Sequence, residues 1–196
     1  MKSKGESTRR RIVEQTAGLL NTRGYLGTPV SEIMRVTGMQ KGGIYNHFES
    51  RNALTLEAFD YGAGQMRALF RQALEGEAKA TDKLLALFAV FRAFPRKDMP
   101  LGGCPIMNLA VESDHADPEL RATARKAMER LIGLLERVIA RGIARKEFAK
   151  GNARSRASLI MASLEGGVML SNLYKDCAHL DAVLDHLERQ VKTGFQ

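Results

Sequence analysis

A stretch of polar and basic side chains at residues 40–47 has the composition of a surface that binds DNA. Lys41 lies early in this stretch, where its ammonium group can reach a phosphate, and Tyr45 and His47 follow about one helical turn later. The two glycines after Lys41 carry no side chain, so the backbone between these residues can approach phosphates or bases closely. If the stretch is the second helix of a helix-turn-helix, it enters the major groove and its first residues read base edges. We therefore expect hydrogen bonding and charge pairing with DNA at this surface.

Three short helices must position these side chains. A first helix ends at Gly24, and a second begins with Thr28 as its N-cap and Pro29 at its first position. The second helix ends at Gly38, which can adopt a left-handed backbone and reverse the chain tightly. The third then runs from about residue 40 to 48. Two helices joined by a glycine-containing turn, with another before them, are typical of a helix-turn-helix domain.

Residues 24–48, GYLGTPVSEIMRVTGMQKGGIYNHF, resemble the DNA-binding signature of the TetR family of bacterial transcriptional regulators. The matching residues are Gly24-Tyr25, Thr28, Glu32-Ile33, Gly38, Lys41-Gly42 and Tyr45-Asn46-His47-Phe48. The match covers about 50 residues when Ser50, Arg51 and Leu54 are included. The resemblance implies phosphate contacts from Tyr45 and His47.

One residue departs from the family pattern. Family members often have serine before the lysine, where it caps the recognition helix, whereas this chain has Gln40. Glutamine is a poorer cap, but it can pair with adenine through two hydrogen bonds. The complete set of predicted DNA contacts is Thr28, Gln40, Lys41, Gly42, Gly43, Tyr45, Asn46, His47 and Arg51.

The positive charge of the chain is concentrated in the same segment. Of the net charge of +8, residues 1–52 contribute +5, with nine lysines and arginines against four acids, and the other 144 residues contribute +3. This bias favours a nucleic-acid partner for the N-terminal part. Lys41, Arg51 and the Arg9–Arg11 run are the candidate phosphate partners, although that run could instead only keep the first helix soluble.

The rest of the chain also has helical patterns, with no stretch that alternates like a strand. We expect an all-α protein of about nine helices, with a helix-turn-helix domain at residues 1–50 and a larger helical domain at 51–196. The longest apolar run, Leu84 to Phe91, is far shorter than the ~20 residues of a membrane span. Because there are only two cysteines and no secretory signal, we expect a cytoplasmic protein with no membrane partner.

The resemblance implies that the larger domain binds an effector and forms a homodimer. Apolar and polar residues on its middle helices are candidates for effector contacts: Met66, Phe70, Phe88, Phe91, Met107, Asn108, Val111, Glu112, Glu165 and Met169. Small and apolar residues on the penultimate helix recur every three or four positions and are candidates for the dimer interface: Leu159, Ala162, Ser163, Gly166, Gly167 and Leu170. Both sets could instead be core within one chain, as such Phe and Met stripes more often are.

Cys104 lies just before Pro105, near the start of an expected helix, where the helix dipole favours a thiolate. The segment around it is similar to the corresponding part of TetR-family regulators that sense electrophiles or oxidants, so Cys104 is a candidate redox sensor or an inert buried thiol. No spacing predicts a metal site or a cofactor, and no constellation predicts an enzyme. The sequence therefore predicts a dimeric repressor that a small molecule releases from a palindromic operator. The alternatives are a sensor that acts through Cys104, a DNA-binding activator or architectural protein, or a small helical carrier or enzyme.

Overall fold

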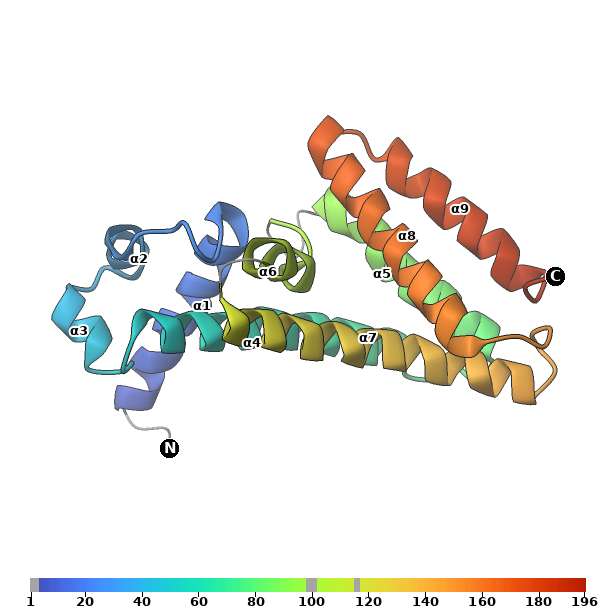
Figure 1. Cartoon of the computed structure of the whole chain (residues 1–196), viewed down its shortest axis with the longest axis horizontal. Helices are drawn as coiled ribbons and strands as arrows, with labels where there is room; N and C mark the ends of the chain where they lie inside the picture. The colour runs from blue at the N-terminus through green and yellow to red at the C-terminus, as the bar shows by residue number, and fades with distance from the viewer. Residues whose placement is uncertain (1–3, 98–101, 115–116) are drawn as a thin grey trace. The chain divides into compact units, whose positions relative to one another are not determined.

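The computed structural model describes residues 4–97, 102–114 and 117–196 (Figure 1). Nine α-helices and no strand form within these residues, which confirms the all-α prediction. The helices are α1 (Lys4–Arg23), α2 (Val30–Thr37), α3 (Lys41–Tyr45), α4 (Arg51–Leu74), α5 (Ala80–Lys97), α6 (Pro105–Ser113), α7 (Pro118–Ala144), α8 (Ala153–Tyr174) and α9 (Ala178–Lys192).

The chain forms two compact units. The head unit comprises Met1–Met66 and Pro100–Arg125, and the body unit comprises Arg67–Met99 and Lys126–Gln196. The boundary expected at residues 50 and 51 instead coincides with the start of α4, whose N-terminal half belongs to the head unit. The head unit also includes α6, which was expected in the larger domain.

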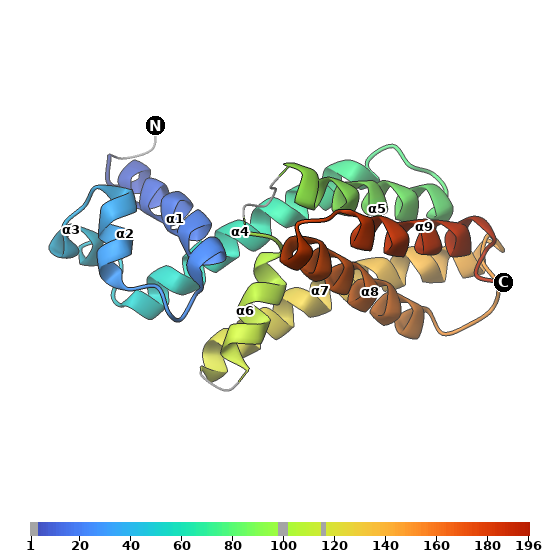
Figure 2. The same cartoon turned by 90° about the horizontal axis from the view of Figure 1, so that it is seen from above.

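The head unit is built around a small apolar core. Ile12 from α1, Ile33 from α2 and Ile44 from α3 are each 1% exposed or less, and they pack with Phe48 and Leu54. Figure 2 shows how α1, α2 and α3 gather around the start of α4. Burial of these side chains fixes the orientation of α3, because its single buried residue must face the core.

The turn between α2 and α3 is the one that the sequence predicts. Gly38 has φ +64, a left-handed conformation that glycine adopts without the steric penalty of a side chain. The following helix is shorter than expected, ending at Tyr45 rather than near residue 48. Its two glycines provide little helix propensity, and the chain turns at Asn46 and His47, where the His47 N–H donates to the Ile44 carbonyl.

The body unit holds α5, α8 and α9 with the remaining parts of α4 and α7, and α8 and α9 lie side by side (Figure 1). Arg92 of α5 joins α5 to α9 through Asp181, Asp185 and Glu188, at 2.8, 2.9 and 2.8 Å. Hydrogen bonding to Glu188, opposed by partial burial, raises the pKa of Arg92 above its ordinary value. Within the described residues, no helix is both long and apolar enough to span a membrane.

Candidate nucleic-acid interface

The outer face of α3 presents the predicted DNA-binding residues. Ile44 is 1% exposed and anchors the helix in the head core. Lys41, Gly42 and Asn46 are exposed on the opposite side, and Tyr45 is half-buried beside them. A five-residue helix with one buried anchor thus holds a cation, a bare backbone and polar side chains on a single surface.

The glycines of α3 are not required by contacts within the protein. A Cβ built at Gly42 would meet no atom within 4 Å, and one at Gly43 would meet only the terminal methyl of Met39, at 3.0 Å. Glycine inside a helix costs about 1 kcal/mol relative to alanine. Gly42 therefore lowers helix stability without relieving any internal clash, and at Gly43 only the flexible end of the Met39 side chain would have to move. This is expected where another molecule approaches the backbone closely.

Gln40 occupies the N-cap of α3 in an extended conformation, and its side chain makes no capping hydrogen bond. The side chain is exposed, and its amide is not used within the helix. Gln40 therefore does not provide the capping hydrogen bond of the serine that family members often have at this position. A base contact by Gln40 stays a prediction.

Two predicted contacts require correction, because their side chains bind the protein itself. Thr28 is not the N-cap of α2: Pro29 occupies that position, and the Thr28 hydroxyl donates to the Gly24 carbonyl at 2.6 Å. Thr28 is also only 3% exposed. The Arg51 Nη2 donates to the carbonyl oxygens of Tyr25, Leu26 and Thr28, at 3.0, 3.0 and 2.7 Å. Arg51 thereby fastens the loop between α1 and α2 to the start of α4, and its observed role is structural.

The Arg9–Arg11 run divides in the same way. Arg9 forms an ion pair with Glu57, and its guanidinium lies 4.7 Å from the centre of the Phe48 ring. The Arg9 Nε also donates to the His47 carbonyl at 3.3 Å, which ties α1 to the segment after α3. Arg10 pairs with Glu14, whereas Arg11 is exposed and forms no ion pair among the residues that the structure describes. Arg9 and Arg10 thus have partners inside the head, and Arg11 remains a candidate phosphate contact.

The polar residues predicted to orient an effector on α6 instead bind the head. The Asn108 Nδ2 lies 2.9–3.2 Å from the Asn21 carbonyl, the Asn21 Oδ1 and the Gly102 carbonyl. The Glu112 Oε2 accepts the Leu26 N–H at 3.0 Å. Asn108 and Glu112 therefore attach α6 to α1 and to the loop that follows it.

The remaining α6 candidates also differ in placement. Met107 is half-buried, whereas Val111 is 70% exposed and does not face the interior. Cys104 occupies the N-cap position of α6, makes no capping bond and is only 2% exposed.

Tyr25, in the loop that α6 contacts, is also buried. Its burial, together with smaller electrostatic effects of Cys104 and Glu112, raises the pKa of Tyr25 well above its ordinary value.

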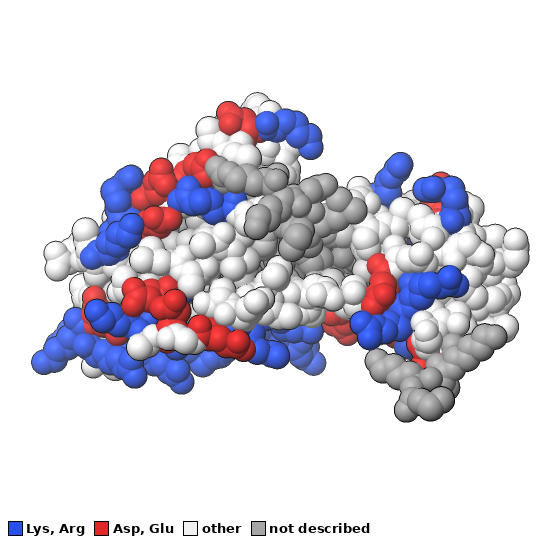
Figure 3. Space-filling view, turned by 180° about the vertical axis from the view of Figure 1, so that it is seen from behind, with Lys and Arg blue, Asp and Glu red and all other residues white. Residues whose placement is uncertain are grey.

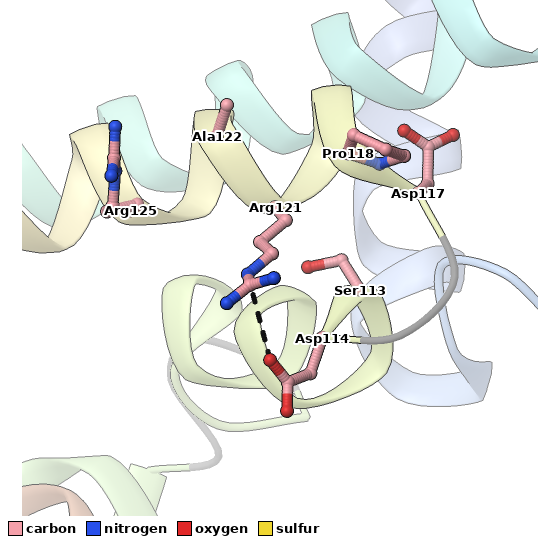
Figure 4. A pocket seen from close by; sticks show the side chains of 7 residues that line it. All are labelled: Ser113, Asp114, Asp117, Pro118, Arg121, Ala122 and Arg125. Atoms are coloured by element: carbon pink, nitrogen blue, oxygen red, sulfur yellow. Dashed lines mark ion pairs between the residues drawn. The ribbon is translucent and has the colours of Figure 1, made fainter.

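A cavity of about 660 Å³ lies where α6 ends and α7 begins, at residues that no sequence pattern marked as a site. Figure 4 shows Arg121 directed toward Asp114, 3.7 Å from it, with Arg125 further along α7. Ser113 and Asp117 face the same space, but Ser113 donates to the Leu109 carbonyl and Asp117 caps the start of α7. Ser113, Asp114, Asp117 and Arg121 thus have partners within the protein.

Some predicted effector residues meet in the body unit. Phe70 and Phe91 stack with ring centres 5.5 Å apart, and with Met161 they line an apolar void of about 10 Å³. A void this small holds at most a single water molecule, so these side chains form packed core. Phe88 and Glu165 are buried in the same unit, and Met66 is buried in the head unit. Met169 is 43% exposed, which corrects its predicted place in the interior.

The outer face of α8 carries exposed apolar side chains. Leu159 and Leu173 are each 67% exposed, and Tyr174 is 63% exposed. Of the other predicted interface residues, Ala162 is exposed, whereas Ser163, Gly166 and Leu170 are half-buried. Gly167 is a correction, because a Cβ there would lie 3.0 Å from the Leu180 side chain of α9. It allows α8 and α9 of one chain to pack closely, whereas Leu173 and Tyr174 extend the exposed stripe beyond the predicted set.

Comparisons with known proteins agree with this architecture. Residues 12–58 match the family model described as bacterial regulatory proteins of the tetR family, and residues 80–187 match the tetracyclin repressor-like C-terminal domain. A crystal structure of a TetR transcriptional regulator from Chloroflexus aurantiacus is 40% identical, with a TM-score of 0.91 and 96% of each chain covered. An uncharacterized HTH-type transcriptional regulator of Mycobacterium tuberculosis is 30% identical over 91% of each chain. The Escherichia coli repressor NemR is 22% identical over 95% of this chain and 94% of its own.

Proposed function

The chain belongs to the TetR family of bacterial transcriptional regulators, and from that premise we propose that it is a dimeric repressor released from a palindromic operator by a small molecule. The observation that carries the proposal is α3, which exposes a cation, polar side chains and a bare backbone while one isoleucine holds it in the head core. Such a surface has no evident use inside the protein.

In this proposal α3 enters the major groove. Gln40 reads a base edge at the start of the helix, and Lys41, Tyr45 and His47 contact phosphates. Two heads in a two-fold dimer bind half-sites about 34 Å apart, or a multiple of that distance. The operator is therefore an inverted repeat.

The exposed stripe on α8 supports the dimer part of the proposal. Leu159, Leu173 and Tyr174 are large exposed side chains on one face of α8, with the exposed Ala162 and the half-buried Leu170 between them, and exposed apolar surface of this kind is typical of protein interfaces. A second copy of the chain is the proposed occupant. Its own α8 presents the same stripe, as a two-fold interface requires.

Release by an effector requires two states of the dimer. A ligand lowers operator affinity only if it binds more tightly to the state that binds DNA less well. Operator DNA must then lower the affinity for that ligand by the same factor. The proposed regulation can therefore be measured either as the loss of operator affinity when ligand is added or as the loss of ligand affinity when operator is added.

Operator binding can be tested by selecting fragments of the source genome with the purified protein and footprinting the retained fragments. We expect an inverted repeat bound at least a thousandfold more tightly than a random duplex. The Tyr45→Phe variant should lower operator affinity about three- to tenfold per half-site, because it removes one hydrogen bond to a phosphate. The matched control Tyr61→Phe alters a half-buried tyrosine on α4 and should leave affinity unchanged. Binding no tighter than to a random duplex would refute the proposal.

The dimer can be tested by light scattering on two charge insertions. Leu173→Arg places a cation in the proposed interface and should give a monomer with weakened operator binding. The control Val111→Arg changes a residue that is 70% exposed on α6 and should leave a dimer. A wild-type monomer, or a dimer that persists in Leu173→Arg, would contradict the proposed interface.

A second candidate is regulation through Cys104. This cysteine begins the helix that Asn108 and Glu112 attach to the head, and the related repressor NemR has been crystallised in a form described as reduced. Modification of a buried thiol there would displace α6 from its contacts with α1. In a Cys177→Ser background, maleimide should then lower operator affinity. Complete alkylation with unchanged affinity would exclude this alternative.

A further inference from the structure

A groove of about 320 Å³ in the body unit is lined by four arginines and four apolar residues. Helix α4 contributes Arg67, Phe70, Arg71 and Leu74, and α7 contributes Arg130, Leu131, Leu134 and Arg137. Figure 3 shows blue basic side chains gathered along the lower left edge, over α4 and α7. No local sequence pattern marks these arginines as a group, because they come from two helices far apart in the chain.

Within the described parts of the chain, no acid pairs with any of the four arginines. Glu129 and Glu136, the acids in the middle of α7, both pair with Arg154 of α8, at 2.7 and 3.5 Å. Helix α4 has no acid between Asp60 and its end at Leu74. Among the described residues, none of the four groove arginines forms an ion pair. Four uncompensated cations around one groove create a positive potential that attracts an anion.

The floor of the groove is apolar. Phe70 is 2% exposed and Leu131 is 3% exposed, and Phe70 stacks on Phe91 behind it. Phe70, Leu131 and Leu134 also form one wall of the small apolar void of the body core. The half-buried Leu74 and Leu134 supply the accessible part of this floor, and Phe70 and Leu131 lie buried beneath it. The groove therefore offers hydrocarbon contacts beneath a guanidinium rim, and its volume lies at the lower end of the range for small-molecule sites.

We propose that this arginine groove binds a small amphipathic organic anion. The ligand class is an aromatic or aliphatic body with a carboxylate, sulfonate or phosphate head group. Guanidinium groups bind such heads through paired N–H donors, which a lysine cannot match, while the body lies on the accessible floor formed by Leu74 and Leu134. Taken together with the proposed repressor function, on which this step rests, the anion is the effector.

The binding part is tested with two fluorescent probes that share the same rings. 8-Anilinonaphthalene-1-sulfonate carries an anionic head, and N-phenyl-1-naphthylamine is its neutral counterpart. We expect the sulfonate to bind about tenfold more tightly or better, since two charge-assisted contacts account for at least that factor. Inorganic sulfate should displace the sulfonate probe only weakly, because it has no apolar body. Decanoate, which has both a carboxylate and an apolar body, should displace the sulfonate probe efficiently. Equal affinity for the two probes, or displacement by sulfate as efficient as by decanoate, would overturn the proposal.

Two double variants locate the site. Arg67→Gln with Arg137→Gln removes one cation from each helix of the groove and should abolish the preference for the sulfonate while leaving the neutral probe unaffected. Lys150→Gln with Arg189→Gln removes the same charge from exposed positions of the body unit outside the groove and should change neither affinity. Thermal unfolding of both variants checks that the fold is retained. Sulfonate binding that is unchanged in the groove variant places the site elsewhere and refutes the assignment.

The effector part is tested on the complex of protein and operator. The sulfonate probe should weaken operator binding by the wild type and have no such effect on the groove variant. Arginine-dependent probe binding without any change in operator affinity would refute the role of the groove in regulation and leave the repressor proposal intact. Failure of the wild type to select an operator would refute the repressor proposal and leave the groove as a binding site.

Discussion

Changing Lys41 and Arg51 separately to glutamine distinguishes a DNA contact from a structural clamp. Both residues are cations of the basic N-terminal segment, and the sequence pattern does not separate their roles. In the structure Lys41 is exposed at the start of α3, whereas Arg51 donates from one nitrogen toward three backbone carbonyls. Arg51→Gln should therefore lower the stability of the protein and leave its DNA contacts unchanged. Lys41→Gln should weaken DNA binding and leave the stability almost unchanged.

The magnitude for Arg51→Gln follows from those three carbonyls. One Nη2 has two hydrogens, so it makes about two full hydrogen bonds, and each bond to a charged donor contributes about 1.5–3 kcal/mol. Allowing for the partial exposure of Arg51, we expect a loss of roughly 2–3 kcal/mol, which lowers Tm by about 4–12 °C in a chain of this length. Lys41→Gln changes an exposed side chain and should alter the free energy of unfolding by no more than about 0.5 kcal/mol.

DNA binding gives the complementary readout. The affinity for a short duplex of random sequence is measured as a function of salt, at a temperature where both variants are folded. Lys41→Gln should reduce the log–log salt slope by about 0.9 for each protomer bound, because one fewer phosphate is neutralised. Arg51→Gln should leave the slope unchanged. A reduced slope in Arg51→Gln together with an unchanged Tm would refute the structural role and restore the phosphate contact.

Three further predictions concern stability. Gly42→Ala should raise helix stability by up to about 1 kcal/mol, because the new Cβ meets no protein atom, and it should weaken operator binding; tight binding by a stabilised variant would argue against close approach of DNA to α3. Because burial raises the pKa of Tyr25, the folded state holds the phenol proton more tightly than the unfolded state. The contribution of the protonated phenol to the free energy of unfolding is complete below the ordinary pKa of about 10 and is lost as the pH rises above it. Measured by thermal unfolding, Tyr25→Phe should therefore lose less stability than the wild type at alkaline pH. Gly142→Ala should cost about 1–3 kcal/mol in urea unfolding, since the added Cβ would overlap the Phe148 ring and lie 2.9 Å from the Cβ of Ala80; an unchanged midpoint would contradict this reasoning.

The parts of the fold that depend on local signals could be predicted from the sequence. The left-handed Gly38 and the buried Ile33 and Ile44 follow from turn chemistry and helical periodicity, both of which involve only neighbouring residues. The assignment of α6 to the head could not be predicted. It depends on a hydrogen bond between Asn108 and Asn21, which are 87 positions apart, and no local pattern records such a pairing.

In the candidate DNA-binding site, too, some features follow from local sequence signals and others depend on contacts formed only in the folded chain. The exposed face of α3 follows from its spacing, but the roles of Thr28 and Arg51 depend on which acceptor lies nearest. In both cases the acceptor is a backbone carbonyl of the loop between α1 and α2, which only the folded structure reveals. The stripes of the body unit were ambiguous for a related reason. Helical spacing places residues on a common face, yet it does not tell the buried Phe70 from the exposed Met169.

The charge of residues 53–196, a range that includes the body unit and part of the head unit, illustrates why composition is a weak guide to function. Residues 53–196 carry a net charge of only +3, which reads as a nearly balanced surface. In the structure the ion pairs are unevenly distributed, because Arg92 pairs with three acids and Arg154 pairs with two. The arginines of the groove between α4 and α7 are left without a partner among the described residues. A small net charge can thus conceal a strongly basic site, because pairing is decided by which side chains meet in space. An anion seated in that groove would supply the missing partner, and for this reason the probe comparison addresses charge and apolar contact separately.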